Sequence, residues 1–186
     1  MVERRIISRR SLILILFSTL ACGIAGWWLW RSRPCNGIAM YQDTRDREAV
    51  LKMFHDNWYW LINEQSTFSP EHFLTYRSPT KKLKDYGTSR IFVYCVDNQP
   101  VGFVAWNPLS FYKGRLHLIA VQKDHRGKGI SKQLMKAATE DMKRRGISEV
   151  TLITRTNNEP AKNLYKRLCY EEYWRDNDFV RFKKSL

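Results

Sequence analysis

The chain has 186 residues, 44% of them hydrophobic and 27% charged, which is typical of a single globular domain with a hydrophobic core. Its formal net charge is +14. Of its 32 basic and 18 acidic residues, 26 and 17 follow Pro34, so this larger part carries +9 and attracts anions such as phosphates, acidic lipids or nucleic acid. No basic run is interleaved with aromatic residues, so we do not expect a nucleic-acid-binding module.

The first predicted element is a membrane span. Residues 11–30 contain no charged side chain, and a helix of this length rises roughly 30 Å, the thickness of a bilayer's hydrocarbon core. Tryptophans end this run and arginines flank both of its ends. We therefore expect a basic flank over residues 1–10, a transmembrane helix over 11–30 and a short linker over 31–36. A cleaved signal peptide or lipoprotein signal is the alternative, but no A-x-A site ends the run, and Thr19 stands where a lipoprotein signal has leucine.

The next elements are a strand and two helices. A short strand is expected over 37–41. A helix follows over 46–65, because apolar residues recur there at spacings of three and four, with Asp43 or Asp46 as its acidic cap. Pro70 lies in the first turn of another short helix, where its missing N–H costs nothing.

The remaining chain alternates strands and helices. Turn residues from Asp97 to Pro100 join two β-branched and aromatic runs into a hairpin, and Gly146 ends a long amphipathic helix. The expected elements are strands at 90–96, 101–106 and 115–121, a helix at 129–145, a strand at 149–154, a helix at 160–168, and a closing hairpin of 170–175 with 179–183. Residues 37–186 are therefore expected to form one domain.

The four cysteines, Cys22, Cys35, Cys95 and Cys169, include no CxxC pair. Their spacing predicts neither a zinc site or other metal site nor a disulfide framework. We interpret Cys95 and Cys169 as small buried hydrophobic residues of a protein in a reducing compartment.

A glycine-bearing loop joins the strand that ends at Val121 to the next helix. Gly127 and Gly129 lack side chains where a ligand could approach the backbone, and the helix that follows directs free N–H groups and its positive dipole end to the same place. Such a turn suits a pyrophosphate, and Arg126 and Lys128 add positive charge. By itself the pattern also fits a structural turn, and it has neither the G-K-S/T ending of a P-loop nor the third glycine of a dinucleotide fold.

Two motifs resemble those of the GNAT superfamily of N-acyltransferases. The run RGKGIS from Arg126 to Ser131 matches the acyl-CoA motif Q/R-x-x-G-x-G/A, except that Ser131 replaces glycine or alanine. The run from Asn158 to Tyr170 matches N-x-x-A-x-x-L-Y-x-x-x-G-F, except that Cys169 replaces glycine and Tyr170 replaces phenylalanine. The resemblance implies an α/β (α+β) fold of GNAT type, with a mixed central sheet of about six to seven strands flanked by helices, here preceded by the transmembrane helix.

The resemblance also implies roles for particular residues. The amides from about Gly127 to Ser131 would hold the CoA pyrophosphate, and the end of the preceding strand would pair with the pantetheine arm. Asn158 would contact this arm, and Tyr165 would protonate the leaving thiolate, although Tyr165 also fits a core aromatic position. Splayed strands near Val121 would open a slot in which backbone N–H groups polarise the carbonyl. The cofactor-binding residues expected on this basis are Ile119, Ala120, Val121, Arg126, Gly127, Lys128, Gly129, Ile130, Ser131 and Asn158.

The general base is less well defined. Arg115 occupies the position where many family members have a glutamate, and an arginine cannot serve as the base. His117 lies two residues on, on the same expected strand face, and could relay a proton through water as a catalytic residue; a packed or hydrogen-bonded histidine is the alternative. Glu64, Glu71 and loss of the proton from the amine to solvent are further candidates.

The predicted function is therefore a membrane-anchored N-acetyltransferase that moves an acetyl group from acetyl-CoA to a protein N-terminus, a lysine or a small amine. Arginines are balanced on the two sides of the span, so the cytoplasmic location of acetyl-CoA sets the expected orientation, with residues 11–30 in the bilayer. A non-catalytic CoA-binding module, favoured by Arg115, and transfer of a longer acyl group are the alternatives. The aromatic residues Trp58, Tyr59 and Trp60, with the loop over 75–87, are expected at the acceptor groove or in the core.

Overall fold

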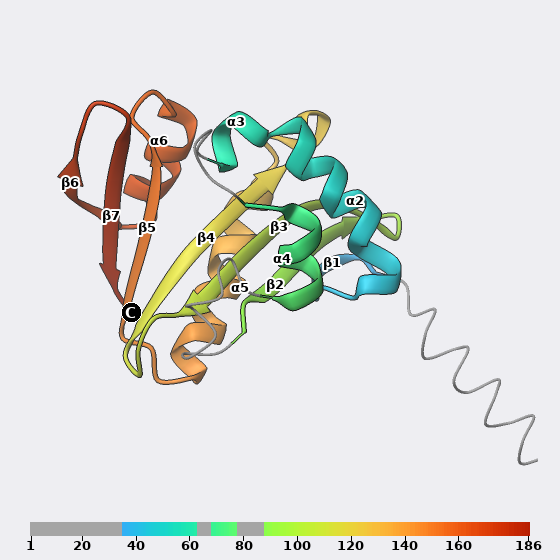
Figure 1. The fold of residues 1–186 in the computed structure, drawn as a ribbon, viewed down its shortest axis with the longest axis horizontal. Coiled ribbons are helices and arrows are strands. Elements are labelled where there is room, and N and C mark those ends of the chain that lie inside the picture. Colours follow the sequence, from blue (N-terminus) through green and yellow to red (C-terminus); the bar gives the residue numbers. More distant parts are fainter. Residues whose placement is uncertain (1–34, 63–67, 78–87) are drawn as a thin grey trace, which may run out of the picture. The chain divides into compact units, whose positions relative to one another are not determined.

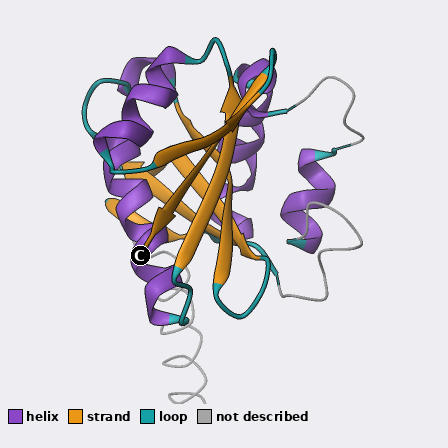
Figure 2. Cartoon of the chain, turned by 90° about the vertical axis from the view of Figure 1, so that its left-hand side faces the viewer, coloured by secondary structure: helices purple, strands orange, loops and turns teal. Residues whose placement is uncertain are grey.

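Seven strands form one mixed sheet in the order β1-β2-β3-β4-β5-β7-β6. The computed structural model describes residues 35–62, 68–77 and 88–186, in which helices lie on both faces of a strongly twisted sheet (Figures 1 and 2). β4 and β5 pair in parallel, and the other neighbouring strands are antiparallel. The expected mixed sheet flanked by helices is confirmed. The strands are β1 Gly37–Met40, β2 Arg90–Val96, β3 Gln99–Pro108, β4 Lys113–Val121, β5 Glu149–Arg155, β6 Glu171–Arg175 and β7 Phe179–Ser185.

The helices enclose two hydrophobic clusters, one on each face of the sheet. Leu134 and Met135 of α5 pack with Phe182 and Trp106 in the first cluster, to which α6 also contributes. Phe54 of α2 packs with residues of α4 and β3 in the second. The helices are α2 Asp43–Asp56, α3 Trp58–Leu61, α4 Pro70–Tyr76, α5 Ile130–Arg144 and α6 Glu159–Arg167, with a 3₁₀ turn η2 at Lys123–His125.

The structure divides the helix expected over 46–65. α2 begins earlier than predicted because Gln42 takes the N-cap position, and the buried carboxylate of Asp46 reaches back to accept the Gln42 N–H at 2.7 Å. It ends before Asn57, whose Nδ2 donates to the Met53 carbonyl at 2.9 Å. The aromatic run that follows therefore belongs to the separate short helix α3.

The hairpin between β2 and β3 is tighter than predicted. Asp97 and Asn98 form a two-residue connection in which both residues have positive φ, at 48° and 64°. This is the conformation of a type I′ turn, which matches the twist of the flanking strands. β3 therefore begins at Gln99 and extends to Pro108.

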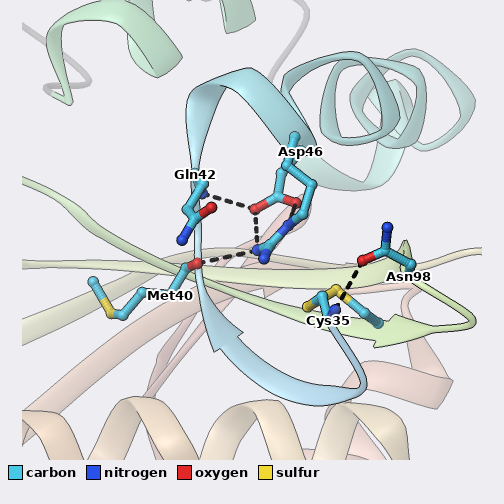
Figure 3. The surroundings of a disulfide bond; sticks show 7 residues. Cys35, Met40, Gln42, Asp46 and Asn98 are labelled. Atoms are coloured by element: carbon cyan, nitrogen blue, oxygen red, sulfur yellow. Dashed lines mark hydrogen bonds and ion pairs between the residues drawn. A yellow bond between two sulfur atoms is a disulfide. The ribbon is translucent and has the colours of Figure 1, made fainter. Parts of the chain in front are cut away.

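The prediction that the cysteines form no disulfide is wrong, although Cys95 is buried as expected. Cys35 and Cys95, separated by 60 residues, form a buried disulfide bond. It ties the chain two residues before β1 to β2, and the Cys35 N–H also donates to Asn98 Oδ1 at 2.8 Å (Figure 3). This pairing depends on the antiparallel contact between β1 and β2, which cysteine spacing does not encode. Cys169 is a free thiol and is exposed, because it follows the last turn of α6 on the surface.

The predicted membrane localisation is corrected. The span predicted at residues 11–30 lies outside the described residues, and so do the flank and most of the linker around it. Among the residues that the structure describes, no helix is long and apolar enough to cross a membrane. The longest of these, α5, has 15 residues and rises roughly 22 Å, which is shorter than a bilayer's hydrocarbon core. The prediction of a single-pass membrane protein with a cytoplasmic catalytic domain is therefore not supported.

Candidate functional site

The two parallel strands at the centre of the sheet separate along their length. β4 and β5 are paired from Lys113 with Glu149 to Leu116 with Leu152, and no pair follows. β4 continues to Val121 and β5 to Arg155, so the edge of β4 that faces β5 has no strand partner over its last five residues. The expected splay is therefore present.

A β-bulge lies where the strands begin to separate. Ala105 and Trp106 of β3 pair with Leu118 and Leu116 of β4, so His117 is the extra residue. Leu116 packs in the cluster under α5, whereas Leu118 packs in the cluster under α2. The two-residue alternation that was expected to place His117 on the face of Arg115 is therefore broken at this point.

A pocket occupies the gap between the strands. α3 contributes to one side of it, and α6 contributes to the other, while β7 reaches it through Phe179. Among the described residues that line it, none is a carboxylate. They are Trp60, Leu61, Ile62, Leu116, His117, Ile119, Ile153, Thr154, Arg155, Asn158, Ala161, Tyr165 and Phe179.

The pocket holds His117 in its neutral form. Its Nε2 atom is buried and has no hydrogen-bond partner among the described residues. Burial, together with the nearby positive charge of Arg115, lowers the pKa of His117 to about 4. At neutral pH this imidazole is uncharged, and it is a much weaker base than an amine.

Tyr165 and Asn158 enter the pocket from α6. Tyr165 is only 4% exposed, and its ring packs against Tyr170 and Phe182. Burial raises the pKa of Tyr165 well above its ordinary value, so the hydroxyl keeps its proton at neutral pH. Asn158 caps α6 by accepting the Ala161 N–H at 3.3 Å, and its Nδ2 donates to Thr154 Oγ1. Both residues that the second motif singled out thus lie in this pocket.

The glycine-bearing loop at the end of β4 leaves its backbone open to a ligand. Gly127 and Gly129 have φ of 75° and 76°, and a Cβ built on either would meet no atom within 4 Å. α5 begins directly afterwards, and no side chain caps its N-terminus. The loop therefore presents uncovered N–H groups and a helix dipole to an anion, as the pyrophosphate of CoA requires. Of the other predicted cofactor-binding residues at the start of α5, Ile130 is buried and Ser131 is half-buried.

Arg126 takes a structural position that the sequence did not indicate. Its Nε donates to the Val121 carbonyl at 3.0 Å and its Nη2 to Asn57 Oδ1 at 2.8 Å. The guanidinium thus joins the loop to the junction of α2 and α3. Lys128 is exposed in the same loop.

The sequence did not single out Arg155, which holds α3 against β5. Its Nε donates to the Tyr59 carbonyl at 2.6 Å and its Nη2 to the Ile62 carbonyl at 3.2 Å. Its guanidinium also lies 4.0 Å from the centre of the Tyr59 ring. Its place at the end of a predicted strand beside the slot was a usable signal, but its partners lie more than 90 residues earlier in the chain.

The remaining predicted residues are distributed around the site. Trp58 is half-buried against the core, whereas Trp60 lines the pocket. Arg115 is exposed, and Glu71 is exposed on α4 with its pKa lowered chiefly by a backbone hydrogen bond. Ala120 is buried in the core under α2. Glu64 and most of the loop over 75–87 lie outside the described residues.

Splayed parallel strands, an uncapped helix behind a glycine loop, and a buried tyrosine define an acyl-CoA-dependent N-acyltransferase domain. The chain belongs to the acetyltransferase (GNAT) family, whose model matches residues 49–169. Proteins of this family use acetyl-CoA as co-substrate.

The chain is similar to N-alpha-acetyltransferase 30 of Schizosaccharomyces pombe, with 38% identity over 63 residues, and spans 42% of that protein and 34% of its own length. It is also similar to an N-alpha-acetyltransferase of Saccharolobus solfataricus, with 33% identity over 115 residues that cover 68% of that protein and 55% of this chain. Its fold is that of the PaiA N-acetyltransferase from Thermoplasma acidophilum in complex with coenzyme A, with a TM-score of 0.62, 19% identity, and coverage of 80% of this chain and 99% of that one.

Proposed function

We propose that this protein transfers the acetyl group of acetyl-CoA to the α-amino group of a polypeptide. The observation that carries the proposal is that the described residues lining the pocket include no carboxylate, and that the buried His117 among them has a pKa of about 4. These described residues supply no strong base with which to deprotonate an ammonium group. The acceptor must therefore arrive as a neutral amine.

This requirement separates the possible acceptors. At pH 7.5 roughly a third of an α-amine with pKa near 7.8 is neutral, against about 0.1% of a lysine side chain with pKa near 10.4. A polyamine would also leave further positive charges without carboxylate partners in a pocket that already contains Arg155. The names of the two relatives agree with an α-amine acceptor.

The acetyl-CoA site follows from the glycine loop. The N–H groups from Gly127 to Ser131 would hold the pyrophosphate, because neither glycine carries a side chain over them. The free edge of β4 would pair with the pantetheine arm as an added strand, with Ile119 beside it. Val121 is less available for this pairing, since its carbonyl already accepts from Arg126. Asn158 faces the same pocket and is placed to contact the arm.

Acetyl-CoA supplies a thioester that an amine can attack directly. Unpaired N–H groups of β4 near the bulge at His117 would stabilise the negative charge on the carbonyl oxygen. Tyr165, protonated at neutral pH, would give its proton to the departing thiolate. His117 would offer its unpartnered Nε2 as a neutral hydrogen-bonding group to the substrate.

Two peptides of matched sequence test the proposal on the full chain. One has a free N-terminus and no lysine, and the other has a blocked N-terminus and one lysine. We expect CoA release and a single acetylated α-amine with the first peptide only, at a rate that rises with pH up to about 8 as the amine becomes neutral. Acetylation of the lysine peptide or of spermidine, without the first peptide, would refute an α-amine acceptor.

A further inference from the structure

In the described part of the chain, one half of the sheet is open on the face opposite α5 and α6, except where α3 packs at the end of β5. In β5 and β7, Leu152 and Phe182 point into the core under these helices, so the alternate residues face away from it. Ile153 on this outer face is 43% exposed, although it is a large aliphatic residue. Among the described helices, α2 and α4 lie over the part of the sheet from β1 to β4, and α3 contacts β4 and the end of β5 (Figure 1).

This open face is basic. We call it the basic sheet face and define it by Arg115, Arg181 and Lys183, with Ile153 and Trp174 between and beside them. In register, Arg115 neighbours Thr151, Thr151 neighbours Lys183, and Ile153 neighbours Arg181. Among the described residues, none of the three cations forms an ion pair with a carboxylate. Glu171 is the register neighbour of Lys183 and offsets part of the charge.

The aromatic side chains hold the cations in place. The guanidinium of Arg181 lies 4.3 Å from the centre of the Trp174 ring, and Lys183 Nζ lies 6.0 Å from the centre of the Tyr173 ring. A guanidinium positioned in this way is presented to a carboxylate at a reduced entropic cost.

The basic sheet face is continuous with the pocket. Ile153 and Arg155 of β5 line the pocket, and the strand neighbour of Ile153 is Arg181. Lys183 lies two residues further along β7, and an extended chain advances roughly 3.3 Å per residue. A polypeptide whose N-terminus lies in the pocket therefore reaches Arg181 and Lys183 with roughly its third to sixth residues.

We infer that the preferred acceptors are polypeptides with acidic side chains at about positions three to six, held by the basic sheet face. This inference rests on the proposed α-amine acceptor and adds the charge of the following residues. Carboxylates at these positions would pair with exposed cations, whereas lysines there would be repelled. We expect kcat/KM to be about tenfold higher for an acidic than for a basic peptide of the same length, since each exposed pair adds only a modest factor.

The test uses the full chain and three peptides with the same first two residues, followed by four glutamates, four glutamines or four lysines. The wild-type protein should favour them in that order, and the difference should shrink in high salt because surface charges are screened. In the double variant Arg181→Gln, Lys183→Gln, the ratio of acidic to basic kcat/KM should fall toward one. A matched double variant, Lys143→Gln with Arg144→Gln, removes two exposed cations from the end of α5 and should keep the wild-type ratio.

Each outcome decides between the two proposals. Equal rates with all three peptides overturn the acidic preference but leave the α-amine acceptor standing. A preference that survives in the Arg181 and Lys183 variant shows that another surface reads the charge, and overturns the assignment to the basic sheet face. If no peptide with a free N-terminus is acetylated, both proposals fail together. If the wild-type protein retains RNA, only the Arg181 and Lys183 variant loses it, and no peptide is preferred, the face would be identified as a nucleic-acid surface.

Discussion

Arg126 Nη2 donates to Asn57 Oδ1 across 2.8 Å and so links the loop before α5 to the break between α2 and α3. Arg126 also donates a hydrogen bond to the Val121 carbonyl, and Asn57 donates one to the Met53 carbonyl. Four segments therefore meet in one hydrogen-bonded chain. The glycine-bearing loop and the helix α3, which lines the pocket, are thereby fixed relative to each other.

A double-mutant cycle measures this link. Asn57→Ala and Arg126→Ala should each lower the free energy of unfolding by about 1–3 kcal/mol, because each leaves a partly buried polar group without its partner. The double variant should lose less than the sum of the two, by about 1–3 kcal/mol, since the second change removes a group already unpaired. Urea unfolding of the four proteins provides the values. Strictly additive losses would show that the pair is not coupled.

Tyr165 and Tyr170 offer a matched pair of tyrosines. Both are 4% exposed and their rings are in contact, but the pocket is lined by Tyr165. If Tyr165 donates the proton to the thiolate, Tyr165→Phe should lower kcat by about 10²–10⁴-fold, with little change in stability.

The Tyr170→Phe variant is the control for packing. The Tyr170 hydroxyl is buried without a partner among the described residues, so its loss should leave kcat within twofold and raise stability slightly, by about 1 kcal/mol or less. Steady-state assays with saturating acetyl-CoA compare the two variants. A similar small effect in both would remove Tyr165 from the proposed mechanism.

The neutral state of His117 makes stability depend on pH. Its folded-state pKa of about 4 lies below the ordinary value of 6.5, so the unfolded chain binds the proton first. The contribution of neutral His117 to the free energy of unfolding is present in full above pH 6.5. It is lost as pH falls toward 4, by about 3 kcal/mol in total.

A His117→Gln variant should lack this part of the acid sensitivity. Urea unfolding at pH 7 and pH 4.5 gives the difference for each protein, and the wild type should lose more stability than the variant by roughly 2–3 kcal/mol. Equal losses would mean that His117 is solvated and titrates normally.

The ends of α5 and α6 have the same backbone motif but different residues. Gly146 and Cys169 both have positive φ, at 79° and 60°, and in each case the residue that follows donates back to the helix, Ile147 to Met142 and Tyr170 to Tyr165. The left-handed conformation costs a cysteine more than a glycine.

Cys169→Gly should therefore raise the free energy of unfolding by about 1 kcal/mol, and Gly146→Ala should lower it by a similar amount. No atom lies within 4 Å of a Cβ built at Gly146, so the loss there reports the backbone conformation alone. Thermal unfolding under non-reducing conditions, which keep the Cys35–Cys95 bond intact, measures both variants. A destabilised Cys169→Gly protein would contradict this account.

Features that depend on neighbouring residues could be predicted from the amino-acid sequence. The glycine loop with its helix start, the capped helix that carries Asn158 and Tyr165, and the order of strands and helices are local patterns, and the structure has each of them. The turn at Asp97 and Asn98 is likewise local, and only its length was misjudged.

The tertiary structure decided what depends on residues far apart in the chain. The Cys35–Cys95 bond, the contact of Arg126 with Asn57 and the position of Arg155 over Tyr59 join segments separated by 60 to 96 residues. The pKa of His117 is lowered chiefly by its burial, which does not appear in the order of residues. The basic sheet face exists because strand register places Arg115, Arg181 and Lys183 on one surface. Local propensities depend on short runs of residues, whereas strand register and burial arise only when the strands pair.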